Sequence, residues 1–421
     1  MQSSMGLLTR RRFLPLFVTQ FLGAFNDNLF KNAMVLFAVY NVYSDPKQET
    51  WFSGLATGLF ILPFFLLSAT SGQLADATDK ARIIRLVKLA EILIMIVGAI
   101  GLLLPSIPLM LAALLAMGVH STFFGPIKYA ILPQHLERDE VLAGTGLVEA
   151  GTYISILAGT IIAGVIPVKA AAAMVVIVAV LGYLAGRQVP PAPPTGELDH
   201  VDHNPLTASY RLVSSTMHIR KLFLAILSIS FFWMIGAVLF VQFPPLVKNV
   251  LTADKAVASL FLAVFSVGVA IGSVIINRLL KGEVSARYSP PAVIVMGGFV
   301  LAFYLIARSW VPDGRDLYDV MEFIAHPGAP ALLGALLGVA IAGGVFVVPL
   351  YAFLTTTVSQ GETARTVAAN NIVNSGAMVI GSVCALGLSF VGVSAVDQFL
   401  MTAGMCLISA ALAWKLHRAC D

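Results

Sequence analysis

Long apolar runs separated by short polar segments dominate the pattern of this chain. A helix that crosses a membrane needs about 20 apolar residues, and twelve windows of that kind follow one another along the sequence. They cover residues 13–40, 51–74, 83–104, 107–125, 141–166, 168–186, 219–247, 257–279, 290–309, 329–357, 366–390 and 396–415. The pattern therefore predicts an all-α membrane protein with twelve transmembrane helices.

The composition strengthens this interpretation and excludes a soluble protein. Hydrophobic residues make up 58% of the chain, charged residues make up 11%, and the mean hydropathy is +0.89, whereas about a quarter of a soluble domain is charged. Most of the 26 Lys and Arg residues fall in alternate loops on the side of the amino terminus, which predicts that both termini are cytoplasmic. Because these residues report topology, the net charge of +4 does not indicate a nucleic-acid partner.

A Pro-rich polar segment in the middle of the chain, RQVPPAPPTGELDHVDHNPLTASYRLVSSTMH, cannot form a core. It predicts an amino-terminal six-helix bundle over 1–187, a cytoplasmic linker over 188–218 and a carboxy-terminal six-helix bundle over 219–421. A weak internal repeat supports the division, because GPIKYAIL at 125 and GLVEAG at 146 resemble VPLYAFL at 348 and NIVNSG at 371. Two parallel six-helix halves are a known transporter architecture.

Charged residues inside the first apolar window are the first candidates for function. On a helix, Gln20, Gly23, Asp27 and Lys31 fall on one face, and Asn28 flanks it. Asp27 and Lys31 are four residues apart, so one interpretation is a purely structural ion pair. The other, which we favour because of the neighbouring amides, is that these groups line a substrate or ion path through a polar cavity between the two bundles.

A second group of ionisable residues lies in the fourth and fifth windows. His120 comes before a Gly-Pro step at 125 that we expect to break the helix, Lys128 follows that step, and Glu149 lies two turns into the next helix with Thr145 and Thr152 on its face. The three ionisable groups are expected to converge in the cytoplasmic half of the first bundle. The alternatives are a Glu149 satisfied by threonines, a Lys128 that reaches the headgroup region without a role, and a His120 that packs rather than carries protons.

The carboxy-terminal half has no charged side chain away from its helix ends. Its prominent polar residues there are amides, namely Gln242, Asn370, Asn371 and Asn374. This asymmetry suits an amphiphile, whose charged headgroup would meet the first bundle while its acyl chain lies against the second. A small hydrophilic solute would call for polar groups on both sides.

The loop between the second and third windows reads SGQLADATDKARIIR. Gly72 permits close helix approach, and Asp76 beside Lys80 and Arg82 is expected to form a cytoplasmic gate that breaks when the halves move. The order G-x-x-x-D followed by basic residues resembles the signature of the major facilitator superfamily, although the base expected directly after the acid is Ala77 here.

Three further motifs resemble one family within that superfamily. AFNDN in the first window, GPIKYAILPQ after the fourth and GLVEAG in the fifth are similar to the bacterial lysophospholipid transporters, including versions fused to acyltransferases. The resemblance implies movement of lysophosphatidylethanolamine and related lysolipids from the outer to the inner leaflet of the bacterial cytoplasmic membrane. It points to Asp27, Asn28, Lys128 and Glu149 as headgroup or gating residues.

One departure from this family concerns the seventh helix. Where the family carries an arginine, the chain reads FFWMIGAVLFVQFPP, with Phe240 and no cation. The resemblance then assigns the phosphate to Lys31 or Lys128, or it implies a different substrate range. In the resulting hypothesis, alternating access moves a lysolipid. Asp27 and Glu149 bind its cationic amine or hold the basic residues in place, and Asn28 and Gln20 supply neutral hydrogen bonds.

The expected partners are the lysophospholipid, membrane lipids and a cytoplasmic acyltransferase, and we expect a monomer without cofactor or metal. Cys384, Cys406 and Cys420 lack metal-ligand spacing. The alternative function is a proton-coupled exporter of amphipathic drugs or metabolites, in which Asp27, Glu149 or His120 titrates.

An enzyme is a third possibility, and the sequence speaks against it. An acyltransferase motif H-x-x-x-x-D is absent, because His135 has Asp139 four residues on and Glu140 five residues on. No cluster of serine, histidine and aspartate typical of a hydrolase is evident in the loops either.

Overall fold

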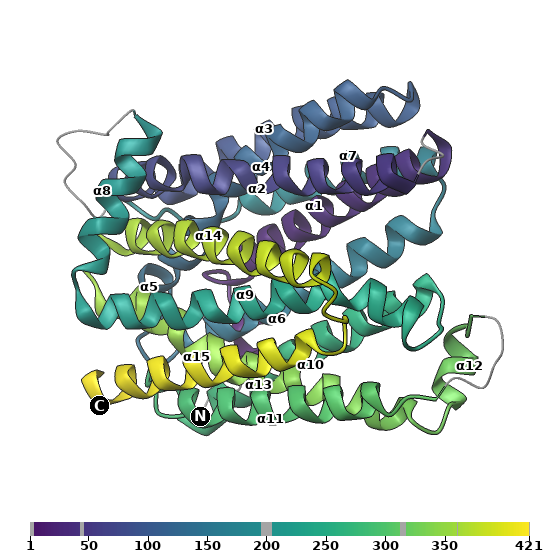
Figure 1. Cartoon of the computed structure of the whole chain (residues 1–421). Coiled ribbons are helices and arrows are strands. Elements are labelled where there is room, and N and C mark those ends of the chain that lie inside the picture. The colour runs from purple at the N-terminus through teal and green to yellow at the C-terminus, as the bar shows by residue number, and fades with distance from the viewer. Residues whose placement is uncertain (1–3, 43–45, 195–203, 312–316, 360, 421) are drawn as a thin grey trace. The chain divides into compact units, whose positions relative to one another are not determined.

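A computed structural model describes residues 4–42, 46–194, 204–311, 317–359 and 361–420, and most of these residues are helical (Figure 1). The helices up to the central segment are η1 (Ser4–Thr9), α1 (Leu14–Asn41), α2 (Pro46–Ala77), α3 (Lys80–Leu103), α4 (Ile107–Ala130), α5 (Leu132–His135), α6 (Val141–Val165) and α7 (Val168–Gly186). The later ones are α8 (Pro205–Met217), α9 (Arg220–Asn249), α10 (Lys255–Leu280), α11 (Ser289–Arg308), α12 (Val320–Ala325), α13 (Ala329–Thr357), α14 (Thr363–Phe390) and α15 (Gln398–Cys420).

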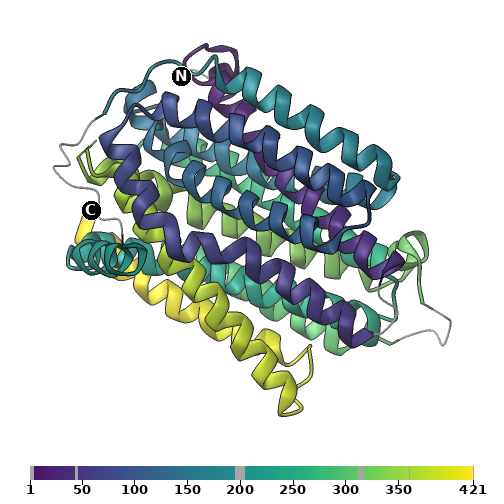
Figure 2. The same ribbon diagram turned by 90° about the horizontal axis from the view of Figure 1, so that it is seen from above.

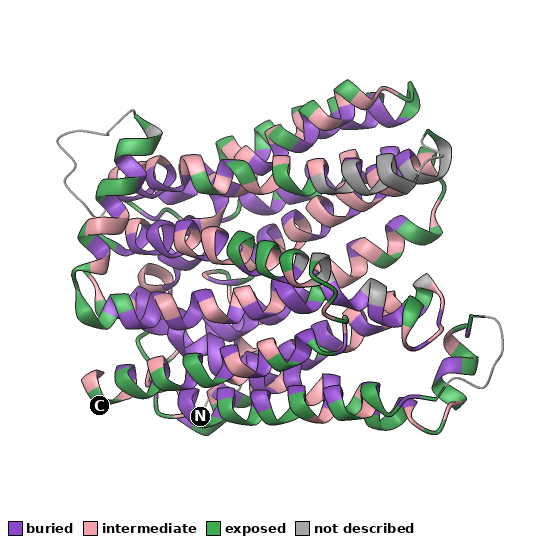
Figure 3. Cartoon of the chain, viewed as in Figure 1, coloured by how far each residue is buried: buried purple, intermediate pink, exposed green. Residues whose placement is uncertain are grey.

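Eleven helices in the described part of the chain are long and apolar enough to cross a membrane. Large apolar side chains are exposed along them, as for Leu86 at 60% and Leu305 at 62%, and Figure 3 shows such exposed positions along the helices. Because so much apolar surface would be unstable in water, the chain is a multi-pass membrane protein. The expected twelfth span corresponds to α1, which is 28 residues long but carries Asp27 and Lys31. That α1 spans, and that both termini are cytoplasmic, remain predictions.

One expectation about the fourth helix is wrong. The Gly-Pro step at 125 does not break it, because α4 continues through Pro126 to Ala130. Proline has no N–H to donate to the carbonyl four residues earlier, which is that of Thr122. The Ser71 hydroxyl of α2 donates a hydrogen bond to this carbonyl at 3.0 Å. A neighbouring helix therefore satisfies the group that the proline leaves open, as is common in membrane helices.

The chain forms two compact units. The first comprises Met1–Thr216 and Leu354–Ile372, and the second comprises Met217–Phe353 and Val373–Asp421. Part of the expected linker, residues 195–203, lies outside the described residues, and α8 occupies most of the remainder. The boundaries expected from the sequence for the two bundles remain predictions.

Close helix contacts through glycine organise the first unit. Within it, α1 packs against α6 and α7, α3 packs against α4 and α7, and α2 packs against α4 (Figures 1 and 2). A Cβ on Gly159 of α6 would lie 2.5 Å from the carbonyl oxygen of Phe25 in α1. A Cβ on Gly118 of α4 would lie 2.7 Å from the carbonyl oxygen of Phe60 in α2. These approaches bring the polar face of α1 within reach of its neighbours.

In the second unit, α15 packs against both α9 and α11. Phenylalanine rings fill much of its interior. The ring centroids of Phe243 and Phe261 are 5.6 Å apart, those of Phe261 and Phe303 are 6.1 Å apart, and those of Phe303 and Phe399 are 4.9 Å apart. This core is mainly apolar.

Candidate functional site

The two charged residues of α1 contact different helices of the first unit. The Ser121 hydroxyl of α4 donates a hydrogen bond to Oδ2 of Asp27 at 2.6 Å, and Oδ1 of Asp27 is buried without a hydrogen-bond partner among the described residues. The ammonium nitrogen of Lys31 lies 5.7 Å from the centroid of the Phe60 ring in α2. Asp27 and Lys31 form no ion pair with each other in this structure. The interpretation of these two residues as a purely structural ion pair therefore loses its main support.

The α1 stripe is the helix face formed by Gln20, Gly23, Asp27 and Lys31, with Asn28 beside it. Its amide side chains are partly hydrogen-bonded. Oε1 of Gln20 accepts a hydrogen bond from the Thr152 hydroxyl of α6 at 3.0 Å, while its Nε2 is buried without a hydrogen-bond partner in the described chain. The side-chain amide of Asn28 donates to the carbonyl of Ala24 in its own helix at 2.8 Å. Together with Oδ1 of Asp27, Nε2 of Gln20 is therefore an open polar atom of the stripe.

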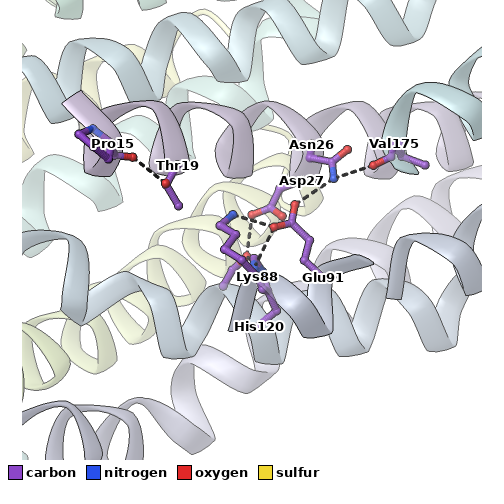
Figure 4. A network of polar contacts seen from close by, with 9 residues as sticks. Pro15, Thr19, Asn26, Asp27, Lys88, Glu91, His120 and Val175 are labelled. Carbon is purple, nitrogen blue, oxygen red and sulfur yellow. Dashed lines mark hydrogen bonds and ion pairs between the residues drawn. The ribbon is translucent and has the colours of Figure 1, made fainter. Parts of the chain in front are cut away.

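A buried charge cluster, made of Lys88, Glu91, His120 and Asn26, lies beside this stripe (Figure 4). The ammonium nitrogen of Lys88 lies 2.7 Å from Oε2 of Glu91, and these side chains are 0% and 2% exposed. Nε2 of His120 lies 3.3 Å from the same oxygen. Asn26 donates a hydrogen bond to the other oxygen of Glu91 at 2.9 Å. Three helices, α1, α3 and α4, therefore satisfy one carboxylate.

Sequence reasoning did not single out Lys88 and Glu91. The signal was present, because these two residues interrupt an apolar run three positions apart and so share one helix face. Gly23 of α1 makes room for the pair, since a Cβ there would lie 2.6 Å from the ammonium nitrogen of Lys88.

His120 connects the buried charge cluster to the α1 stripe. Its Nδ1 lies 3.3 Å from the hydroxyl oxygen of Ser121, whose own proton is donated to Asp27. With its other nitrogen near Glu91, His120 completes a continuous line of polar contacts from Lys88 to Asp27. The structure places His120 here, and it shows no contact of His120 with Lys128 or Glu149.

Lys128 and Glu149 lie around Tyr129 at the end of α4. The Tyr129 hydroxyl donates a hydrogen bond to Oε1 of Glu149, which is 1% exposed, and the ammonium nitrogen of Lys128 lies 4.8 Å from the centroid of the Tyr129 ring. The hydroxyls of Thr145 and Thr152 donate to the backbone carbonyls of Val141 and Val148, with Thr152 also reaching Gln20. Tyr129, which the sequence did not indicate, is therefore the hydrogen-bond donor to Glu149. The sequence had suggested threonines for this role.

The expected gate residue Asp76 contacts the start of α14. Its carboxylate, fully buried, accepts hydrogen bonds from the backbone N–H groups of Ala364 and Arg365, each at 3.2 Å, and from Nε of Arg365 at 3.0 Å. A carboxylate at the amino-terminal end of a helix is stabilised by the unpaired N–H groups and the helix dipole. Gly72 permits this approach, because a Cβ there would lie 2.7 Å from the Cβ of Ala368.

The two basic residues expected in the gate, Lys80 and Arg82, differ in burial. Lys80 is fully buried at the first turn of α3, where its backbone N–H donates to the carbonyl of Ala192 at 2.9 Å. Arg82 is exposed and contacts no other side chain in the described chain. Arg365, which lies 289 residues further along the sequence, makes an ion pair with Asp76.

The amides of the second unit bind one another and aromatic side chains. Gln242 donates a hydrogen bond to Gln398 at 2.5 Å. Asn374 accepts one from Ser230 at 2.6 Å and donates to the Tyr351 hydroxyl at 3.3 Å. Gln242 and Asn374 are thus hydrogen-bonded within their own unit. Asn370 belongs to the first unit, and both polar atoms of its side chain are buried without a hydrogen-bond partner among the described residues.

Two residues that the sequence discussed lie in different surroundings. Phe240 is 38% exposed and packs edge-on against Phe243 and Phe265, so the position is apolar. His135 lies at the end of α5 with Nε2 3.3 Å from the carbonyl oxygen of Pro191, and burial lowers the pKa of its imidazole.

Comparison with solved structures gives the fold. The chain is similar to the human organic anion transporter MFSD10 (TETRAN), with a TM-score of 0.77 and 14% identity over 96% of this chain and 99% of that one. It is also similar to the Major Facilitator Superfamily transporter FucP in its outward conformation, with a TM-score of 0.73 and 13% identity over 97% and 99% of the two chains.

Curated relatives carry more information about function. The chain is 25% identical to the "Lysophospholipid transporter LplT" of Cronobacter sakazakii, over 88% of this chain and 86% of that protein. It is 26% identical to the protein of the same name from Enterobacter sp. (strain 638), over 84% and 81% of the two chains. These matches confirm the resemblance to bacterial lysophospholipid transporters. The model of the Major Facilitator Superfamily matches residues 16–321, and the chain therefore belongs to this superfamily of membrane transporters.

Proposed function

We propose that this transporter moves lysophospholipids, chiefly lysophosphatidylethanolamine and related species, from the outer to the inner leaflet of a bacterial cytoplasmic membrane. The names of its curated relatives support the substrate class. The superfamily supports transport rather than an enzymatic reaction. The headgroup and the direction come from the resemblance and belong to the proposal.

The proposal rests on polar groups in the helices of the first unit that make no ion pair, or that lack a hydrogen-bond partner, among the described residues. Lys31 and Lys128 contact aromatic rings, and neither makes an ion pair with a carboxylate that the structure describes. Oδ1 of Asp27 is buried without a hydrogen-bond partner from the described residues. Uncompensated charge costs a few kcal/mol or more inside a membrane. A headgroup with one phosphate and one ammonium offers each of these groups a partner.

These groups have distinct roles in the proposal. Lys31 and Lys128 bind the phosphate. These two lysines thereby replace the arginine that the family carries at the position of Phe240. Asp27 binds the ammonium and Glu149 holds Lys128 in place. Gln20 and Asn28 give neutral hydrogen bonds, and the open amide nitrogen of Gln20 supports its role as a donor.

Alternating access requires a gate that can break, and the contact between Asp76 and Arg365 fits this requirement. Its three hydrogen bonds join residues of α2 and α14 that lie 288 or 289 positions apart in the sequence, so movement of α14 relative to α2 would break them. In this proposal both termini are cytoplasmic and the protein works as a monomer. Helix α1 also crosses the membrane, which gives twelve spans together with the eleven described above. A cytoplasmic acyltransferase consumes the transported lysolipid.

The test is uptake of radiolabelled lysophosphatidylethanolamine into spheroplasts that lack their own lysolipid transporter. We expect uptake to rise well above that of spheroplasts carrying an empty vector. Uptake of glycerophosphoethanolamine, which has the headgroup without an acyl chain, is the control measurement. Absence of lysolipid uptake by a well-expressed protein would exclude the proposed substrate.

A proton-coupled exporter of amphipathic compounds is the second candidate. The line of polar contacts from Lys88 through Glu91 and His120 to Asp27 favours it, because protons can move along such chains. Uptake that is insensitive to an uncoupler and to an imposed pH gradient would exclude it. Transport that is lost both on addition of the uncoupler and on a change of the imposed pH gradient would favour proton coupling.

A further inference from the structure

A second basic site lies in the first unit, away from the α1 stripe. It is a cavity of about 630 Å³ lined by Arg11, Arg12, Arg85 and Arg187 together with the segment Gln188 to Pro191. Arg11 and Arg12 come just before α1, Arg85 lies in the second turn of α3, and Arg187 follows the last residue of α7. Three helix ends thus direct four guanidinium groups to one cavity.

Most of this positive charge is not neutralised. Arg12 makes ion pairs with Glu140 at 2.7 Å and with Glu137 at 3.6 Å. Arg11, Arg85 and Arg187 make no ion pair with a carboxylate in the parts of the chain that the structure describes. The cavity therefore retains three uncompensated guanidinium groups.

Asp79, just before α3, has hydrogen-bond partners of its own. Oδ1 of Asp79 accepts hydrogen bonds from the backbone N–H groups of Ala81 at 2.8 Å and Ala192 at 3.2 Å. These bonds fix the start of α3 and the segment that lines the cavity. Asp79 is thereby held in a structural role.

Exposed apolar side chains continue from the cavity along two adjacent helices. In α3, Leu86 and Leu89 are 60% and 46% exposed, and in α7, Leu181 and Leu184 are 48% and 47% exposed. The two helices pack against each other (Figures 1 and 2). Leu86 directly follows Arg85, and Leu184 lies about one turn before Arg187. A basic cavity and a lipid-facing apolar surface are thus contiguous.

We propose that this cavity binds the phosphate of an anionic membrane phospholipid, whose acyl chains lie on the exposed leucines of α3 and α7. Guanidinium groups bind phosphate oxygens through paired, charge-assisted hydrogen bonds. Basic pockets between membrane helices on the cytoplasmic side are suited to anionic headgroups. The apolar surface favours a lipid over a soluble phosphate. The site is distinct from the one proposed for transport and does not depend on it.

The test is native mass spectrometry of the full chain in detergent with added phosphatidylglycerol or, in parallel, phosphatidylcholine. The variant Arg85→Ala/Arg187→Ala removes two charges that face the cavity. The matched control Arg220→Ala/Lys221→Ala removes two exposed charges at the start of α9. All four positions are exposed, so the fold is expected to persist, and thermal unfolding of each variant checks this.

We expect the wild type and the control to bind phosphatidylglycerol about ten-fold more tightly than the cavity variant does. We expect all three proteins to bind phosphatidylcholine with similar affinity. Added salt is expected to weaken this difference. Equal losses in both variants would overturn the proposal, because the binding would then be a general surface effect. Displacement of the lipid by equimolar glycerol 3-phosphate would also overturn it, because the site would then recognise free phosphate alone.

Discussion

Buried charged residues of the first unit fall into two kinds at the residue scale. The ammonium of Lys88 and the carboxylate of Glu91 lie 2.7 Å apart, Asn26 donates a hydrogen bond to this carboxylate, and Nε2 of His120 lies 3.3 Å from it. Asp27, by contrast, keeps an open oxygen. In the proposed function, the paired charges serve the structure and the open oxygen of Asp27 is available to the substrate.

The first prediction concerns the buried pair. Replacing Lys88 with Ala leaves the Glu91 carboxylate without its ammonium partner, so we expect a loss of about 3 to 5 kcal/mol in the free energy of unfolding. The double variant Lys88→Met/Glu91→Leu removes both charges and is expected to lose less. Chemical unfolding in detergent measures both values. A double variant less stable than Lys88→Ala would contradict this account.

Sequence reasoning at this scale found single residues but not their partners. Asp27, Lys128 and Glu149 stand out because they interrupt apolar runs. Their partners Ser121 and Tyr129 are ordinary residues in helices that only tertiary packing brings close. One sequence contains no information about which distant side chains meet, so these contacts could not be predicted.

Glycine-mediated helix contacts dominate at the element scale. Between membrane helices, packing replaces the hydrophobic driving force, and small residues allow the backbones to approach. Gly159 provides this where α6 meets α1, with its missing side chain directed at the backbone of Phe25 and Leu29. The position of the α1 stripe depends on this contact.

The second prediction tests that dependence. Gly159→Ala would place a methyl group 2.5 Å from the carbonyl oxygen of Phe25, and we expect a destabilisation of about 1 to 3 kcal/mol and reduced transport. Gly164→Ala in the same helix is the control, because no atom lies within 4 Å of a Cβ there. Thermal unfolding and uptake of both variants are compared. Similar losses in the two variants would argue against a specific contact between α1 and α6.

The apolar windows predicted the helices well, since spanning length and hydrophobicity are local properties. The prediction ended the fourth helix at 125, whereas α4 extends to Ala130. Local rules place a boundary at proline. The hydroxyl of Ser71, from another helix, removes the penalty by binding the carbonyl of Thr122. A tertiary contact thus overrides a local signal.

At the scale of the whole molecule, the proposed gate rests on a contact between distant parts of the chain. The sequence indicated Asp76 and Gly72 but assigned the bases nearby. The structure brings a further base from a distant helix, Arg365, and the first N–H groups of α14 to the carboxylate. Neighbouring positions in sequence are a poor guide to partners when helices from different parts of the chain meet.

The third prediction compares two arginines. Arg365→Ala removes the ion pair with the fully buried Asp76, so we expect the gate to open more readily and the transport rate to change several-fold. Arg82→Ala removes an exposed arginine from the expected gate loop and is predicted to have little effect. Accessibility of cysteines introduced along α2 to a membrane-impermeant reagent reports gate opening. Equal accessibility in the wild type and Arg365→Ala would show that this contact does not control the gate.

The measurement that tests the central claim most directly is uptake of labelled lysophosphatidylethanolamine by spheroplasts carrying the wild type, Asp27→Ala or Asp139→Ala. Asp139 is an exposed acid of the same unit and serves as the charge-matched control. We expect Asp27→Ala to reduce uptake at least about ten-fold at equal membrane expression, because it removes a charge-assisted contact with the headgroup, while Asp139→Ala retains full uptake. Full uptake by Asp27→Ala would contradict the account, because the open carboxylate of α1 would then have no part in binding the lysolipid.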